Sequence, residues 1–201
     1  MSENNQTEQG LAANTQGRRV FMRRAGTGAV IAALPMKSVW ANGITNSIIA
    51  SGHGSDWAGG ATLRLQDREF FKANYSRNNP GPLFKDIFGG PAIHSNGSES
   101  LADSATFYNI LRRKDNDGNR DGKFRGPKRY NQQLVTMYLN ALNNGSSDIV
   151  YPVVNQTTGR PFQSAEQYAQ QLYTMTIGTP AASGTALGSL ILDPSSFSVS
   201  P

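Results

Sequence analysis

RYNQQLVTMYLNALN, residues 129–143, carries apolar side chains in two adjacent rows at helical spacing. The rows are Leu134, Tyr138 and Ala141, and Val135, Leu139 and Leu142. Two adjacent rows form a face wide enough to be covered from more than one side. We therefore predict a helix here, the most buried element of the protein, which the sequence Asn143-Asn144-Gly145 ends.

The spacing of apolar residues predicts further helices before this stretch. Residues 65–75 form a short helix that NNPGP at 78–82 breaks, and residues 83–90 form an apolar turn ended by glycines. A longer helix is predicted to begin near Ser100, because Ser100 and Asp103 approximate a capping box. Its inward face consists of Leu101, Ala105, Tyr108 and Leu111.

The C-terminal part of the chain is predicted to hold one more helix. Residues 148–154 form a short extended segment, and a helix follows Ser164. The inward residues of that helix are Ala165, Tyr168, Ala169, Leu172 and Met175. Beyond Ile177, Gly, Ala, Ser, Thr and Pro predominate, and only LGSLILD at 187–193 is apolar enough to pack. The predicted fold is mainly α, a small domain of three to four helices with short β segments and glycine-rich loops.

Composition and pattern divide the chain into four regions. They are an export signal peptide (1–41), a glycine-rich linker (42–61), a helical domain (62–177) and a polar C-terminal tail (178–201). The net charge is +5, of which the signal region carries +3, so the rest is nearly balanced and predicts no nucleic-acid partner. The chain has no cysteine, which excludes disulfides, thiolate nucleophiles and cysteine-ligated metals.

Residues 17–43 have the three ordered parts of an export signal. Four arginines precede a weakly apolar stretch, residues 25–36, which is too short to span a bilayer. Val39-Trp40-Ala41 then offers small residues for cleavage after Ala41. The alternative interpretation is a basic tail on a buried helix.

This signal resembles the twin-arginine type, in which Ser/Thr-Arg-Arg precedes x-Phe-Leu-Lys. Arg18, Arg19 and Phe21 match that motif, while Gly17 departs from it. The resemblance implies a bacterial or archaeal protein that the twin-arginine export machinery carries in folded form to the periplasm, the cell surface or the medium. No membrane span is predicted to remain after processing.

The order of pieces in the remaining chain resembles a poorly characterised module of bacterial secreted and surface proteins. That module opens with a Cys-x-Pro-Gly-Tyr-Trp-Lys-Asn-His motif, to which residues 70–74 correspond. Residues 87–89 match its Phe-Gly segment, residues 133–143 its second helix, and Tyr151-Pro152 the pair that follows. The Cys is missing, and Arg68-Glu69 replaces the Pro-Gly pair. The resemblance implies an extracytoplasmic structural or binding module, and the family has no known catalytic residues to carry over.

DNDGNRDGKF, residues 115–124, is similar to an EF-hand calcium loop counted from Asp117, with Gly122 at the sharp turn. The predicted ligands are Asp115, Asp117, Asn119, Asp121 and the backbone carbonyl of Lys123. Lys128 stands where such a loop needs an acidic ligand, so any calcium site is predicted to be weak. The alternative is an ordinary loop in which Asp and Asn side chains bond to nearby backbone.

The same region is strongly basic, with eight Lys/Arg against three Asp over residues 112–129, a net of +5. The predicted anion-binding patch is Arg112, Arg113, Lys123, Arg125, Lys128 and Arg129, with Lys114 and Arg120 beside it. Such a charge weakens the binding of a divalent cation and attracts an acidic polysaccharide, lipid headgroups or an acidic envelope protein. The alternative is a solvated basic loop.

Two further groups of residues raise alternative functions. His53, Ser55 and Asp56 lie together in SGHGSDW, and a hydrolase would use His53 or His94 with a carboxylate such as Asp56 or Asp67. No Gly-x-Ser-x-Gly elbow is present. The second group consists of the aromatic residues Trp57, Phe70, Phe71 and Tyr75, which form either a carbohydrate-stacking platform or part of the core.

The predicted function is an exported, non-enzymatic structural or binding protein of the cell envelope or extracellular matrix. Apart from weakly bound calcium, no cofactor is predicted. The alternatives are an exported hydrolase that uses His53 and Asp56, and an accessory subunit exported together with a folded partner.

Overall fold

The computed structural model describes residues 63–154 and 162–194, which belong to one compact unit. These residues contain six α-helices, and their β structure is limited to isolated bridges such as that between Arg64 and Val150. The prediction of a mainly α domain is therefore confirmed. In this part of the chain, no helix has the length and apolar character needed to cross a bilayer.

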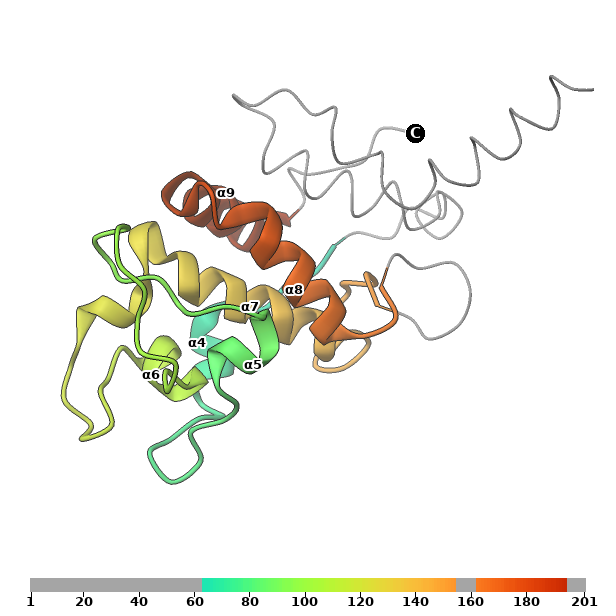
Figure 1. Ribbon diagram of the computed structural model, residues 1–201. Helices are drawn as coiled ribbons and strands as arrows, with labels where there is room; N and C mark the ends of the chain where they lie inside the picture. The colour runs from blue at the N-terminus through green and yellow to red at the C-terminus, as the bar shows by residue number, and fades with distance from the viewer. Residues whose placement is uncertain (1–62, 155–161, 195–201) are drawn as a thin grey trace, which may run out of the picture. The chain divides into compact units, whose positions relative to one another are not determined.

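The helix α7, Tyr130–Leu142, is the centre of the described part (Figure 1). It contacts four other helices: α4 (Arg68–Lys72), α6 (Phe107–Arg112), α8 (Ala165–Thr176) and α9 (Pro180–Leu192). Eleven of its 13 residues are buried, which confirms the prediction for this stretch. Among the six residues of the two apolar rows, Leu142 is the exception, since 53% of it is exposed. As the last helical residue, it lies past the neighbours that cover the two apolar rows.

Buried polar side chains of α7 hold irregular segments of the chain in place. Asn131 accepts a hydrogen bond from the Ile93 amide (3.1 Å) and donates to the Ile93 carbonyl (2.7 Å). Asn140 makes the same pair of bonds with Gln66 (2.8 and 2.9 Å), and Gln132 donates to the Ile110 carbonyl (2.9 Å). The amides of Asn131 and Asn140 satisfy loop backbone groups, and the amide of Gln132 satisfies a carbonyl near the end of the helix Phe107–Arg112, because buried backbone groups need partners.

Three short helices precede α7: α4 (Arg68–Lys72), α5 (Phe84–Phe88) and α6 (Phe107–Arg112). Asp67 caps α4 by accepting from the Phe70 amide (3.0 Å). Stacked and tilted rings from α5, α6, α7 and α8 meet in the core; they are Phe84, Phe88, Phe107, Tyr138 and Tyr173.

The predicted helix start at Ser100 is wrong, because α6 begins at Phe107 and its cap, Thr106, lies six residues beyond Ser100. Thr106 and Asn109 form a reciprocal capping box. Before it, the Ala105 carbonyl accepts from the Phe84 amide (2.8 Å) and is thus not free to begin a helix. Ser100 instead pairs with Ile93 in an isolated bridge. The four residues predicted to face inward are nevertheless buried.

Two helices follow α7. As predicted, α8 (Ala165–Thr176) begins after Ser164, whose hydroxyl accepts from the Gln167 amide (3.1 Å). The predicted polar tail is wrong for its first part, because α9 (Pro180–Leu192) packs on α7. Leu187, Leu190 and Ile191 are buried. Small residues at Gly184 and Gly188 let α9 approach its neighbours closely, and of this helix the sequence had predicted only residues 187–193 to pack.

Candidate functional site

The segment between α6 and α7 folds back on itself as a hairpin-like loop. Arg113 ends α6 in a left-handed conformation (φ 56°), and its carbonyl accepts from the Asp121 amide (2.7 Å). Lys114 and Arg120 pair in a bridge, and Gly118 (φ 86°) allows the turn between them. Two 3-10 turns, η1 (Gly122–Arg125) and η2 (Pro127–Arg129), then lead into α7.

The loop aspartates bond mainly to nearby groups. The Asp115 carboxylate accepts from the backbone amide (2.7 Å) and the side-chain amide (3.3 Å) of Asn119. Asp121 caps η1 by accepting from the Lys123 amide (3.0 Å) and pairs with Lys123 Nζ (2.7 Å). Asp117 is exposed and lies 3.7 Å from Arg77. This is the arrangement of the alternative prediction, in which Asp and Asn bond locally.

The pKa of Asp121 is lowered. Burial raises it, but hydrogen bonds from the Lys123 side chain and backbone, together with the charges of Lys123 and His94, outweigh that effect. Asp121 is thus held charged as a partner of Lys123. Among the described residues, no three His, Asp or Glu side chains gather as a metal-binding group. Calcium binding by this loop remains a prediction.

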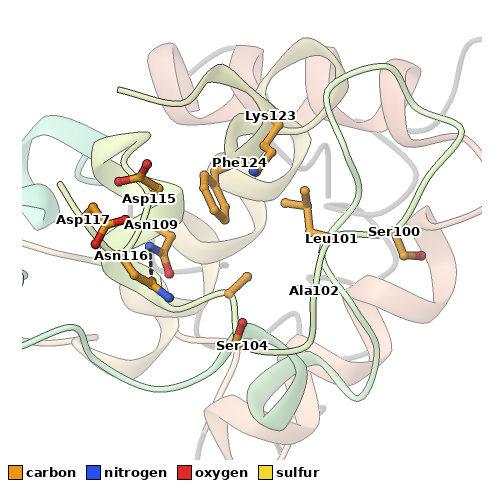
Figure 2. A pocket seen from close by; sticks show the side chains of 11 residues that line it. Ser100, Leu101, Ala102, Ser104, Asn109, Asp115, Asn116, Asp117, Lys123 and Phe124 are labelled. Carbon is orange, nitrogen blue, oxygen red and sulfur yellow. Dashed lines mark hydrogen bonds between the residues drawn. The ribbon is translucent and has the colours of Figure 1, made fainter. Parts of the chain in front are cut away.

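A pocket of about 410 Å³ lies between the loop and the segment 100–105 (Figure 2). Leu101, Ala105 and Phe124 make its apolar part. The polar lining consists of Ser100, Ser104, Asn109, Asp115, Asn116, Asp117 and Lys123. Asn109 fixes the loop side of the pocket, because its amide donates to the Lys114 carbonyl (2.9 Å) and to Asn116 Oδ1 (3.1 Å). A pocket of this volume admits a small ligand or one or two sugar rings.

Sequence reasoning missed this pocket because it placed residues 100–105 in a helix. Of the predicted ligands, Asp115, Asp117 and Lys123 border the pocket, whereas Asn119 and Asp121 are absent from its lining. Among the pocket residues, Phe124 could have been identified from the sequence, since an aromatic residue inside a polar, glycine-rich loop is expected to reach the core.

In the predicted basic patch, some cations are bound to other groups of the protein and others are exposed. Arg112 Nε donates to the Tyr75 carbonyl (2.6 Å), and Lys123 pairs with Asp121. The exposed cations are Arg120, Arg125, Lys128 and Arg129. None of these four takes part in an ion pair with another described residue. The exposed cations are the part of the patch that can meet a partner.

Other predicted sites have different outcomes. His53, Ser55, Asp56, Trp57 and the signal residues Arg18, Arg19, Phe21 and Ala41 lie outside the described residues. His94 Nδ1 accepts from the Asn96 amide (3.1 Å). Phe71 is buried, and Tyr75 packs edge-on against Phe107 with the ring centroids 5.8 Å apart. These two aromatic residues thus belong to the core, while Phe70 is 41% exposed.

Comparison with known proteins found no relative of this chain. No protein-family model matches the chain, and neither a curated protein nor a solved structure matches it. The resemblances to a twin-arginine signal and to a secreted bacterial module remain predictions from the sequence.

Proposed function

We propose that this chain is an exported, non-enzymatic binding protein of the cell envelope or extracellular matrix, and that it binds an acidic polysaccharide. The observation that carries the proposal is the exposure of Arg120, Arg125, Lys128 and Arg129 on one loop, without ion pairs to other described residues. Unpaired surface cations attract polyanions and hold them through salt-sensitive contacts.

The neighbouring pocket adds a place for one part of such a polymer. Its apolar part, which includes Phe124 and Leu101, suits the apolar face of a sugar ring. Its side-chain amides, carboxylates and hydroxyls suit sugar hydroxyls as hydrogen-bonding partners. Because Asp115 and Asp117 border this pocket, the charged groups of the polymer belong at the exposed cations and not inside it.

A charge-matched pair of variants tests the proposal on protein lacking residues 1–41. The first variant combines Arg120→Gln, Arg125→Gln and Lys128→Gln. The control combines Arg64→Gln, Arg77→Gln and Lys85→Gln, whose charges lie near Asp148, Asp117 and Asp103.

Calorimetry with a polyuronate should show at least about tenfold weaker binding for the first variant and a small change for the control, because unpaired cations make the contacts. Equal losses in the two variants would show that only net charge matters and would contradict a binding surface on this loop.

The export part of the proposal is tested with a reporter fused to residues 1–45. We expect export to stop when Arg18→Lys and Arg19→Lys are combined, because the twin-arginine machinery reads this pair. Export that survives the double change would contradict the twin-arginine route.

Calcium is a secondary proposal for the same loop. Asp115 and Asp117 both border the pocket, so a weakly bound Ca²⁺ would draw ligands from them. A rise in melting temperature at millimolar Ca²⁺ that Asp117→Asn abolishes would support it. If millimolar Ca²⁺ produces no heat in calorimetry and no shift in melting temperature, calcium is removed from the proposal.

A further inference from the structure

The pocket drawn in Figure 2, which we call the loop pocket, has a negatively charged lining. Asp115 and Asp117 supply two carboxylates to it, and Lys123 supplies one ammonium group. That ammonium lies 2.7 Å from an oxygen of Asp121, which is not among the lining residues. Arg77, 3.7 Å from Asp117, is exposed and screens its charge only weakly. Because Lys123 is neutralised, the two lining carboxylates set the charge that a ligand meets.

An anionic sugar fits this lining poorly. A uronate carboxylate in the loop pocket would be repelled by Asp115 and Asp117. It carries only hydrogen-bond acceptors, so it could not bond to them either. A sugar hydroxyl or an amide N–H, in contrast, donates to a carboxylate without adding charge. The loop pocket therefore favours an uncharged sugar unit that carries donors.

The remaining lining suits an acetamido group in particular. Leu101 and Phe124, from the two walls of the pocket, offer apolar surface to its methyl group. The amide nitrogen of Asn116 can donate to its carbonyl, because the Asn116 oxygen is the atom that accepts from Asn109 (3.1 Å). The N–H of the acetamido group can donate to a lining carboxylate. An N-acetylated hexosamine thus finds an apolar contact, a donor and an acceptor in one pocket.

A cation for the charged part of the polymer lies directly beside the loop pocket. Phe124 belongs to the lining, and the next residue, Arg125, is exposed and makes no ion pair with another described residue. Both belong to η1, and consecutive Cα atoms are only about 3.8 Å apart. A sugar unit held at Phe124 therefore leaves the adjoining unit within reach of the long Arg125 side chain.

We propose that the loop pocket holds an uncharged N-acetylated hexosamine, and that the acidic polysaccharide is a copolymer in which this unit adjoins a uronic acid. Asp115 and Asp117 then determine specificity, because they keep uronic acids out of the pocket. This inference rests on the proposed function and names the class of polymer that the same surface takes. A polymer of uronic acid alone can use the exposed cations but not the pocket.

Three hexasaccharides, titrated into the full chain by calorimetry, test the class of polymer. They are the alternating hexamer of glucuronate and N-acetylglucosamine, the hexamer of galacturonate, and the uncharged hexamer of N-acetylglucosamine. A chelator is present throughout, so that calcium plays no part. The alternating hexamer should bind at least about tenfold more tightly than the galacturonate hexamer, although it carries half as many carboxylates. Binding through charge alone predicts the reverse order.

Two variants that each lose one negative charge test the role of the lining carboxylates. Asp117→Asn changes an exposed lining residue, whereas Asp103→Asn changes an exposed residue outside the lining that pairs with Lys85 (3.0 Å). Asp117→Asn should tighten the binding of the galacturonate hexamer about fivefold, because one repulsive charge near the ligand is gone. Its effect on the alternating hexamer should be smaller. Equal gains in the two variants would show an effect of net charge and would contradict selection by the pocket.

Filling the loop pocket gives a second test that does not depend on charge. Ser104→Tyr introduces a large side chain at an exposed lining position, and Ser146→Tyr makes the same change at an exposed position outside the lining. Ser104→Tyr should abolish the preference for the alternating hexamer and keep the affinity for galacturonate, while Ser146→Tyr should keep both. A preference that survives Ser104→Tyr would overturn the pocket as its source.

The three hexamers also separate this inference from the proposed function. Wild-type protein that binds the galacturonate hexamer as tightly as the alternating one would overturn the inference and leave the polysaccharide proposal standing. Binding of the uncharged hexamer alone would support a hexosamine in the pocket and contradict an acidic polymer. Protein that binds none of the three would overturn both.

Discussion

The hydroxyl pair of Tyr151 and Tyr168 shows how a single contact stabilises the core. Both side chains are buried and their oxygens are 2.8 Å apart, so one hydroxyl donates a hydrogen bond to the other away from water. Removing one hydroxyl leaves the other buried without a hydrogen-bond partner, whereas removing both leaves an apolar contact between two rings.

The Tyr151→Phe and Tyr168→Phe changes should therefore be non-additive. We expect each single change to lower the free energy of unfolding by about 1–3 kcal/mol, and the double change to cost less than the two together. Urea denaturation of the four proteins measures this. Strictly additive losses would mean that the hydroxyls do not depend on each other.

Asn131 is a buried side chain whose loss should cost much stability. Its amide makes three hydrogen bonds, two to the backbone of Ile93 and one to the Phe124 carbonyl (3.0 Å). Asn131→Ala should lower the free energy of unfolding by about 2–4 kcal/mol, because it leaves several buried backbone groups without hydrogen-bond partners at once. Asn78→Ala, at an exposed position, is the control and should change it little. Similar losses in both would refute the role given to Asn131.

The helices follow from the sequence to different degrees. α7 and α8 were predictable, because large apolar residues recur at helical spacing and Ser164 marks the start of α8. The start of α6 was not, since two capping pairs compete in the sequence, and the bond from Phe84 to Ala105 comes from a distant segment. The first part of α9 was missed because a small residue, Gly184, makes its contact with η2, whereas residues 187–193 were expected to pack.

Gly184 is the point of closest approach between α9 and the turn η2. An added Cβ there would lie 2.9 Å from the backbone oxygens of Pro127 and Lys128. Gly184→Ala should lower the free energy of unfolding by about 1–3 kcal/mol, although alanine favours an isolated helix. Gly178→Ala has open space around its Cβ and should be neutral or slightly stabilising. A stabilising Gly184→Ala would contradict the close packing of α9.

Only part of the candidate site could be predicted from the sequence. The loop and its local Asx bonds follow from DNDGNRDGKF, since short polar side chains bond to adjacent backbone, and its charge follows from the lysines and arginines of residues 112–129. The second wall of the pocket, residues 100–105, depends on a contact with a distant segment, since the Ala105 carbonyl accepts from the Phe84 amide.

The whole molecule should lose stability at high pH. Burial raises the pKa of Tyr130, Tyr138, Tyr151 and Tyr168 above the unfolded value of about 10. Above pH 10 the unfolded chain releases protons that the folded chain keeps, so unfolding becomes more favourable as pH rises.

The free energy of unfolding should thus stay nearly constant from about pH 8 to 9 and fall steeply above about pH 10. Urea denaturation across this range measures the fall. The double variant Tyr151→Phe, Tyr168→Phe has two fewer buried groups to titrate, and its fall should be shallower. Equal slopes in the two proteins would contradict burial as the cause.

The central proposal, that exposed cations of the 112–129 loop hold an acidic polysaccharide, is tested most directly by the salt dependence of binding. The measurement is the affinity of protein lacking residues 1–41 for a polyuronate from about 50 to 200 mM NaCl, with a neutral glucan for comparison. Contacts through three or four cations predict a loss of about tenfold or more over this range and no binding of the glucan. An affinity that does not change with salt, or equal binding of the glucan, would contradict the proposal.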